Sequence, residues 1–202
     1  MADKYPQGIL MPEELTAQIR DKYYYVERCP MTNVERMFFD NSGGSFRLKA
    51  VSEAFSKVDN LPNCTGHGGV VSDYPDSMRV KATEVLKTMF NAQDGCIVTS
   101  MTASIIIWDA IQAVIKSVPG TNVVTTELEH PSSFDSVATA CKELGKELRV
   151  AKTNVKTGSI EPEEVIRLVD KDTCLLSVIM TSNISGAILD IETIVRECRK
   201  IN

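Results

Sequence analysis

The sequence contains no uninterrupted apolar run that approaches the ~20 residues of a membrane-spanning helix. Residues 1–10 are polar and carry both signs of charge, which is not the pattern of a secretory signal peptide. A basic cluster is also lacking. The 202 residues have a net charge of -5, whereas nucleic-acid-binding domains usually present a basic face. We therefore expect a cytoplasmic protein whose partner is neither a nucleic acid nor a membrane.

The sequence has six cysteines but no C-x-x-C pair among them. Their wide separation fits neither the ligand spacing of a zinc site nor the cysteine density of a small secreted disulfide scaffold. We expect reduced thiols, most of them buried as small apolar side chains, and no metal site. The six are Cys29, Cys64, Cys96, Cys141, Cys174 and Cys198.

Helical and strand patterns alternate regularly from residue 76 to the end. The spacing of apolar and capping residues predicts helices over residues 76–90, 103–118, 131–144, 162–169 and 190–200. Short apolar runs predict strands over residues 96–99, 122–126, 148–152 and 174–180. Strands that alternate with helices at this spacing are typical of right-handed βαβ units around a mainly parallel sheet. The predicted class is therefore α/β.

The part before residue 76 is less regular. A proline followed by two acidic residues suits the start of a helix over residues 12–23. Residues 37–39 are expected to form a short strand that ends at the turn-forming stretch 40–44. Apolar periodicity predicts a helix over residues 47–58, and the glycines and prolines of residues 61–75 predict a loop.

Polar residues follow three of the predicted strands, at the carboxyl ends where parallel sheets bind ligands. Residues 100–104 place three hydroxyls and free backbone N–H groups at a helix N-terminus, which suits a phosphate, although N-capping alone needs only one hydroxyl. His130 is either a structural residue or a group that reaches the ligand. Asn183 is either a turn residue or a ligand donor. The fingerprints G-x-G-x-x-G and G-x-x-x-x-G-K-[ST] are missing, which disfavours a nucleotide site.

Three ordered motifs carry a resemblance to a known family: Phe39-Asp40-Asn41-Ser42-Gly43-Gly44, Glu129-His130-Pro131-Ser132-Ser133 and Ser182-Asn183-Ile184-Ser185-Gly186. Together they resemble the pyridoxal-phosphate (PLP)-dependent class V aminotransferases, from Met37 to the end of the sequence. Cysteine desulfurases, selenocysteine lyases and isopenicillin-N-epimerase-like proteins belong to this family. The resemblance implies the three-layer αβα large domain of PLP fold type I. Residues 1–45 would form an N-terminal arm and helix, and residues 46–202 the first part of that domain.

The resemblance also implies a role for each motif in binding pyridoxal 5'-phosphate. His130 would stack on the pyridine ring, and Asn183 would hydrogen-bond the phenolic oxygen of the cofactor. The phosphate would be held by the turn at the start of the helix predicted over residues 103–118. The residues of this turn are Ser100, Met101, Thr102, Ala103 and Ser104. The substrate side would be formed by Asn41, Ser42, Gly43 and His67.

The phosphate turn departs from the pattern of the family at two positions. Met101 takes the place of the usual glycine, and Ala103 takes the place of the second threonine. Thr102 is the best match, and Ser104 is expected to compensate.

A lysine that holds the cofactor through a Schiff base is essential to PLP chemistry, as is an acid that keeps the pyridine nitrogen protonated. In the family both follow the helix at which this chain ends, and the cysteine nucleophile of desulfurases also comes from the later half. We therefore expect the remaining strands and the small C-terminal domain to lie in a longer polypeptide or another chain. Residues 95–99 are expected to have no neighbour in a sheet of the four predicted strands.

The resemblance implies a PLP-dependent enzyme that acts on an amino acid, and the leading interpretation is a cysteine desulfurase or a related C–S lyase. Class V aminotransferase and epimerase activities stay open, because most residues that choose among them lie downstream. A non-catalytic remnant of the fold or a dimerisation partner is a further alternative, to which the departures at Met101 and Ala103 give weight. The expected partners are a small amino-acid substrate and a second copy of the chain in a homodimer.

Overall fold

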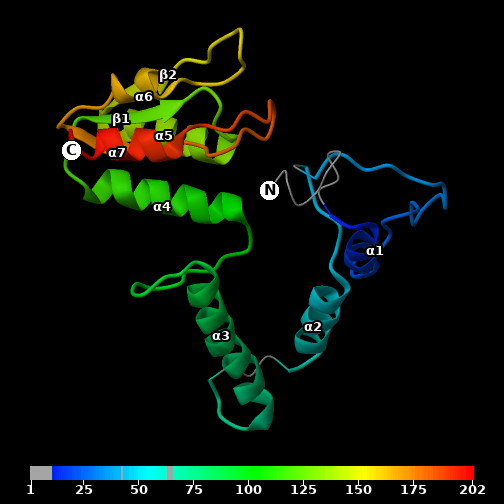
Figure 1. Cartoon of the computed structure of the whole chain (residues 1–202). Helices are drawn as coiled ribbons and strands as arrows, with labels where there is room; N and C mark the ends of the chain where they lie inside the picture. Colours follow the sequence, from blue (N-terminus) through cyan, green and yellow to red (C-terminus); the bar gives the residue numbers. More distant parts are fainter. Residues whose placement is uncertain (1–10, 42, 63–65) are drawn as a thin grey trace. The chain divides into compact units, whose positions relative to one another are not determined.

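The structure is a computed structural model and describes residues 11–41, 43–62 and 66–202 (Figure 1). The chain divides into two compact units, one that extends to Ile97 and one from Val98 to Asn202, and each is described by itself. Within the described ranges, none of the helices has the length and apolar character that crossing a membrane requires. The five described cysteines are free, and three of them are buried as expected: Cys141, Cys174 and Cys198.

The first unit is helical, with no regular strand in the part that the structure describes. Its helices are α1 (Glu13–Asp21), α2 (Lys49–Asp59) and α3 (Val70–Met89). The proline-acid start predicted for α1 is confirmed, because Pro12 occupies the N-cap position and both acids lie in the first turn. Helix α2 confirms the helix predicted over residues 47–58.

The strand predicted over residues 37–39 is wrong. The side chains of Met37 and Phe39 are 87% and 91% exposed. No strand lies beside this segment in the described part of the chain, so its backbone has no ladder in which to pair.

The loop predicted over residues 61–75 ends earlier than expected. Helix α3 begins at Val70 and runs through Pro75, whereas the sequence pattern suggested a start at residue 76. Gly69, with a φ of 103°, supplies the turn into the helix. Pro75 is the sixth residue of α3, where it has no N–H to donate to the carbonyl of Val71 and its ring crowds that carbonyl.

The second unit is built on a three-stranded parallel sheet with the order β2-β1-β3. Its strands are β1 (Asn122–Thr126), β2 (Glu147–Ala151) and β3 (Thr173–Leu176). Val123 of β1 lies opposite Leu148 of β2 and Leu175 of β3. All five residues of β1 are buried. The strand predicted over residues 122–126 and the α/β class are confirmed.

Helices cover both faces of this sheet (Figure 1). They are α4 (Ala103–Ser117) and α5 (Pro131–Leu144), which pack against each other, and α6 (Pro162–Ile166) and α7 (Ile191–Cys198), which also pack together. Val123 belongs to the apolar cluster with α4 and α5, and Val124 belongs to the cluster with α6 and α7. Successive strand residues point to opposite faces, so these two clusters lie on the two sides of the sheet. The three-layer αβα arrangement is thus confirmed.

The predicted strand at residues 96–99 is wrong, and the predicted strand at 174–180 is too long. Val98 is 71% exposed, and no strand of the described chain lies beside it, as expected for a segment without a sheet neighbour. Beyond Leu176 the backbone N–H of Ser177 still donates to the carbonyl of Val124 at 2.9 Å. The ladder then ends, because the backbone N–H of Ile179 donates to the side chain of Glu129 and not to a backbone carbonyl of β1.

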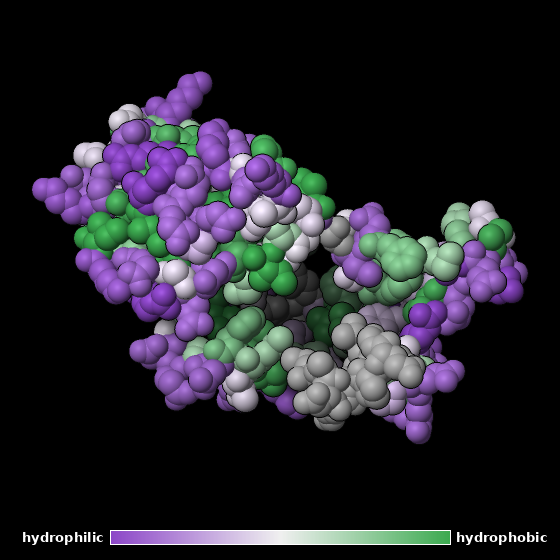
Figure 2. Space-filling model, turned by 45° about the horizontal axis from the view of Figure 1, so that its top comes forward, coloured by the Kyte–Doolittle hydropathy of each residue, from purple (hydrophilic) through white to green (hydrophobic). Residues whose placement is uncertain are grey.

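Apolar side chains also reach the surface among hydrophilic ones (Figure 2). In the second unit the most exposed of them lie on loops: Val155 is 94% exposed, Met101 90% and Ile184 87%. Single exposed apolar residues are normal at protein surfaces. They contrast with the buried aliphatic side chains between the layers, which stabilise the unit.

The contribution of the core can be measured with two isoleucines of the second unit. Ile194 of α7 is 1% exposed, whereas Ile184 is 87% exposed. We expect Ile194→Ala to lower the free energy of unfolding by about 2–5 kcal/mol, because it removes buried methylene groups and leaves a cavity. The matched change Ile184→Ala should alter it by less than about 0.5 kcal/mol. Urea unfolding of both variants tests this, and equal losses would contradict the core described above.

Candidate functional site

Helix α4 begins at the turn that the sequence singled out for a phosphate. Thr102 is its N-cap in extended conformation, and its side-chain oxygen accepts a hydrogen bond from the N–H of Ile105 at 3.3 Å. The carbonyl of Thr102 accepts from Ile106, also at 3.3 Å. The cap therefore uses the N–H of Ile105, one of the N–H groups that have no partner within a helix. The N–H groups of the residues before Ile105 in the first turn remain available to an anion. The predicted residues of this turn are all exposed: Ser100, Met101, Thr102, Ala103 and Ser104.

His130 is the N-cap of helix α5. Its Nδ1 accepts a hydrogen bond from the backbone N–H of Ser132 at 3.2 Å and lies 2.8 Å from the Ser132 hydroxyl. Pro131 occupies the first helical position, which fixes the chain direction after the strand. The imidazole is therefore held by its own helix while it stays exposed to a ligand.

Asn183 lies in a tight loop that follows β3. The loop is closed by an isolated antiparallel bridge between Thr181 and Ile188. Ser182 is buried, and its hydroxyl accepts hydrogen bonds from the N–H groups of Ile184 and Ser185 at 3.3 and 3.2 Å. These bonds fix the loop while the side chain of Asn183 is exposed.

Glu129, the residue before His130, is a functional candidate that the sequence reasoning missed. Its carboxylate accepts hydrogen bonds from Thr126 Oγ1 at 2.9 Å, from Ser133 Oγ at 3.0 Å and from the N–H of Ile179 at 2.5 Å. Burial raises the pKa of this carboxyl, and the three donors oppose that rise. The motif containing Glu129 was recognised, but only its histidine was given a role.

The structure brings three of the predicted groups to one end of the second unit. His130 and Asn183 follow β1 and β3, which are parallel neighbours in the sheet. Helix α4 leads into β1 and α5 leaves it, and the two helices touch where Ser136 Oγ donates to the carbonyl of Trp108 at 3.2 Å. Trp108 and Ser136 each lie five residues after the start of their helix, so the two helices begin at the same level. The N-termini of α4 and α5 therefore both lie at the carboxyl edge of the sheet.

The residues predicted for the substrate side belong to the first unit. The carboxylate of Asp40 accepts from the N–H of Gly43 at 3.3 Å. A Cβ at Gly43 would lie 2.7 Å from Oδ2 of that carboxylate, so a larger residue there would have to displace the Asp40 side chain. Asn41 and His67 are exposed. Ser42 lies outside the described residues.

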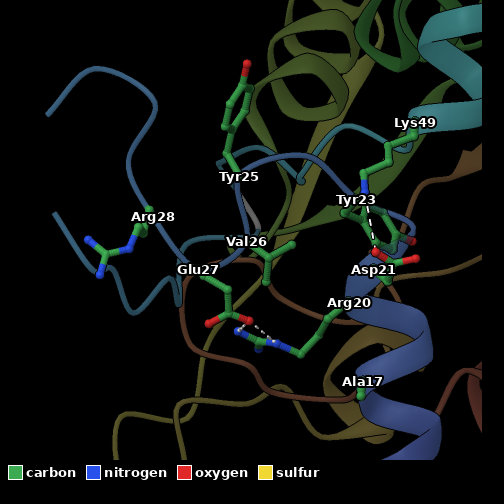
Figure 3. Close-up of a pocket in the computed structure, with 9 residues that line it drawn as sticks. All are labelled: Ala17, Arg20, Asp21, Tyr23, Tyr25, Val26, Glu27, Arg28 and Lys49. Carbon is green, nitrogen blue, oxygen red and sulfur yellow. Dashed lines mark hydrogen bonds and ion pairs between the residues drawn. The ribbon is translucent and has the colours of Figure 1, made fainter. Parts of the chain in front are cut away.

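A shallow groove in the first unit involves different residues (Figure 3). Its lining residues are Ala17, Arg20, Asp21, Tyr23, Tyr25, Val26, Glu27, Arg28 and Lys49. The cations of the groove already have partners: Arg20 pairs with Glu27 at 2.6 Å, Lys49 with Asp21 at 3.6 Å, and Arg28 donates to the Asn33 carbonyl at 2.6 Å. None of the residues predicted to bind cofactor or substrate lines it.

The fold and the polar strand ends define an αβα protein with polar residues at the carboxyl edge of its sheet, which is where open α/β sheets generally bind their ligands. A family model for class V aminotransferases matches residues 37–202. This chain belongs to the class V aminotransferase family, which confirms the resemblance stated from the sequence.

Individual relatives agree with this family. A probable cysteine desulfurase of Borreliella burgdorferi is 27% identical in an alignment of 182 positions that covers 82% of this chain and 40% of the relative. An apo cysteine desulfurase from Thermococcus onnurineus matches with 21% identity and a TM-score of 0.73, over 87% of this chain and 44% of that one. A C-DES variant with glycine covalently linked to its PLP cofactor matches with 14% identity and a TM-score of 0.68, over 91% and 46% of the two chains. The chain thus spans less than half of the length of these relatives.

The capping role of Thr102 can be tested by stability alone. We expect Thr102→Ala to lower the free energy of unfolding by about 0.5–2 kcal/mol, because the N–H of Ile105 loses its acceptor. Thr102→Ser keeps the hydroxyl and should retain most of the stability. Ser104→Ala, a change in the first turn that removes no capping bond, should stay within about 0.5 kcal/mol of the wild type. Urea denaturation measures all three, and an equal effect of Ser104→Ala would contradict the assigned cap.

The raised pKa of Glu129 predicts a pH dependence of stability. A carboxyl whose pKa is higher in the folded than in the unfolded protein costs stability as the pH rises above its usual value of 4.5. Glu129→Gln cannot ionise and avoids this cost. We therefore expect its free energy of unfolding, relative to the wild type, to improve between about pH 4 and about pH 7. Urea unfolding at both pH values checks the sign, and a relative loss toward neutral pH would show that the pKa is lowered instead.

Proposed function

We propose that this protein takes part in PLP-dependent chemistry on an amino acid, with cleavage of the carbon–sulfur bond of cysteine as its reaction. Family membership supports the cofactor, and the names of the relatives support the substrate class. The observation that carries the proposal is the meeting of His130, Asn183 and the start of α4 at one edge of the sheet. Residues 46–202 would form the first part of the PLP-binding domain, and a homodimer is the expected assembly.

The residues present fit a phosphate at the start of α4, despite the departures from the family pattern. Met101 is not among the residues with positive φ, so the backbone at this position does not require the glycine that the family uses. Its side chain is 90% exposed and therefore does not fill the helix start. The family has a second threonine at the position of Ala103. Here Ser104, the next residue, supplies the second hydroxyl beside that of Thr102. Free N–H groups and the helix dipole complete a site for a dianion.

Each group of this edge would have a separate task. The hydroxyls and N–H groups at the start of α4 would bind the phosphate and fix one end of the cofactor. His130, held by Ser132, would present its ring face to the pyridine, and the amide of Asn183 would donate to the phenolic oxygen. When bound, PLP supplies an electron sink for bond cleavage next to the amino-acid α-carbon. The lysine that holds it would come from outside residues 1–202, consistent with the partial coverage of the relatives.

The affinity of the complete protein for PLP, followed by absorbance and by cofactor fluorescence, tests this function. We expect His130→Ala to weaken binding by about threefold to tenfold, because a stacking ring is lost. Ser104→Ala should weaken it by about tenfold, because a hydrogen bond to a charged phosphate is lost. Ser117→Ala makes the same change at the far, exposed end of α4 and should leave binding unchanged.

Two outcomes would contradict the proposal. One is a complete protein that gives no absorbance band and no fluorescence change with PLP. The other is binding that His130→Ala and Ser104→Ala weaken no more than Ser117→Ala does, which would place the cofactor elsewhere. The reaction itself is tested by release of sulfide from cysteine in the presence of a thiol reductant.

A further inference from the structure

The carboxylate of Glu129 joins three separate elements of the second unit. Thr126 donates from the last residue of β1, Ser133 from the first turn of α5, and Ile179 from the segment after β3. The hydroxyl of Ser133 also lies 2.9 Å from that of Ser177, which adds a second link between α5 and the segment after β3. One side chain thus connects the two strand ends that lead to His130 and Asn183.

The carboxylate of Glu129 accepts the next backbone N–H after the hydrogen-bond ladder between β1 and the segment after β3 has ended. Ser177 makes the last bond between the backbones of β1 and the segment after β3, at 2.9 Å to the carbonyl of Val124. Two residues further on, the N–H of Ile179 donates to Glu129 instead of to a backbone carbonyl. An unpaired N–H at this half-buried position would cost free energy, so the carboxylate both satisfies it and fixes its place.

We propose that Glu129 is a positioning residue that sets the spacing between His130 and Asn183 at the cofactor edge. The inference rests on the proposed function, because that function makes both residues cofactor contacts. Glu129 adjoins His130 in the chain, and Ile179 precedes Asn183 by four residues. The bond between Glu129 and Ile179 therefore ties together the two backbones from which these side chains extend.

A role in stability alone is a poor explanation for this carboxylate. Burial makes its ionised form costly, and a well-packed apolar residue often stabilises a fold as well as a buried ionisable one. Its neighbour Glu127 shows the usual alternative at the same strand end. Glu127 is exposed and accepts from Lys152 Nζ at 2.6 Å and from the N–H of Thr153 at 2.9 Å, away from the path to Asn183. These two glutamates therefore form a matched pair for experiment.

The test compares Glu129→Ala, Glu129→Gln and the control Glu127→Ala in the complete protein. PLP affinity is measured by fluorescence, and hydrogen–deuterium exchange of residues 177–183 is measured without cofactor. We expect Glu129→Ala to weaken PLP binding by about tenfold and to speed exchange at Ile179, because its N–H loses the acceptor. Glu129→Gln should recover affinity to within about threefold of the wild type, since its amide oxygen can still accept from Ile179 and its NH₂ group can donate to Ser133. Glu127→Ala should change neither quantity.

Each outcome bears on one claim. Unchanged affinity and exchange in Glu129→Ala, while the wild type binds PLP, would overturn the positioning role and leave the proposed function intact. Failure of Glu129→Gln to recover affinity would also overturn it. Absence of PLP binding by the wild type would overturn the proposed function and this role together. If Glu129→Ala does not fold, Ser133→Ala removes one donor to the carboxylate, and a PLP affinity equal to that of Glu127→Ala would then overturn the positioning role.

Discussion

Strand β1 is the element on which the second unit depends. It is hydrogen-bonded to a parallel strand on each edge, and all five of its residues are buried. Its alternating side chains enter two separate apolar clusters, Val123 on the side of α4 and α5 and Val124 on the side of α6 and α7. The two central valines of β1 enter these clusters, and its polar residues lie toward the two ends, Asn122 at the start and Thr125 and Thr126 at the finish. The carboxyl end of β1 therefore leads from the buried core to the polar residues that follow it.

Parallel pairing then decides which of these ends meet. Because β1 and β3 run in the same direction, the residues after them emerge at the same edge, and the connecting helices begin there. Helix starts carry free N–H groups and a positive dipole end, so the same edge that gathers His130 and Asn183 also offers an anion site at α4. The polar edge is thus a consequence of the βαβ topology, and the individual residues determine its chemistry.

The elements best predicted from the sequence are those with strong local signals and neighbours close in the chain. Residues 122–126 and 131–144 were predicted with the bounds that the structure shows, because an apolar run and a proline followed by a C-cap glycine mark them. Residues 96–99 have the same apolar pattern but no strand beside them, and sequence periodicity does not report whether a partner exists. The positions of His130 and the turn at 100–104 followed from topology. The contacts of Glu129 did not, since its partner Ile179 is 50 residues away.

Glu129 is a half-buried polar residue whose contacts the packing of the core does not explain. The backbone ladder between β1 and the segment after β3 stops at Ser177, and beyond it Leu128 and Val178 still pack against one apolar cluster. A hydrogen bond from a carboxylate has a defined length and direction, whereas apolar contacts tolerate sliding. Placing one carboxylate between Thr126, Ser133 and Ile179 therefore fixes a geometry that packing alone would leave loose. In the proposed role, the free energy lost by burying this carboxylate is offset by a constant spacing between the backbones that carry His130 and Asn183.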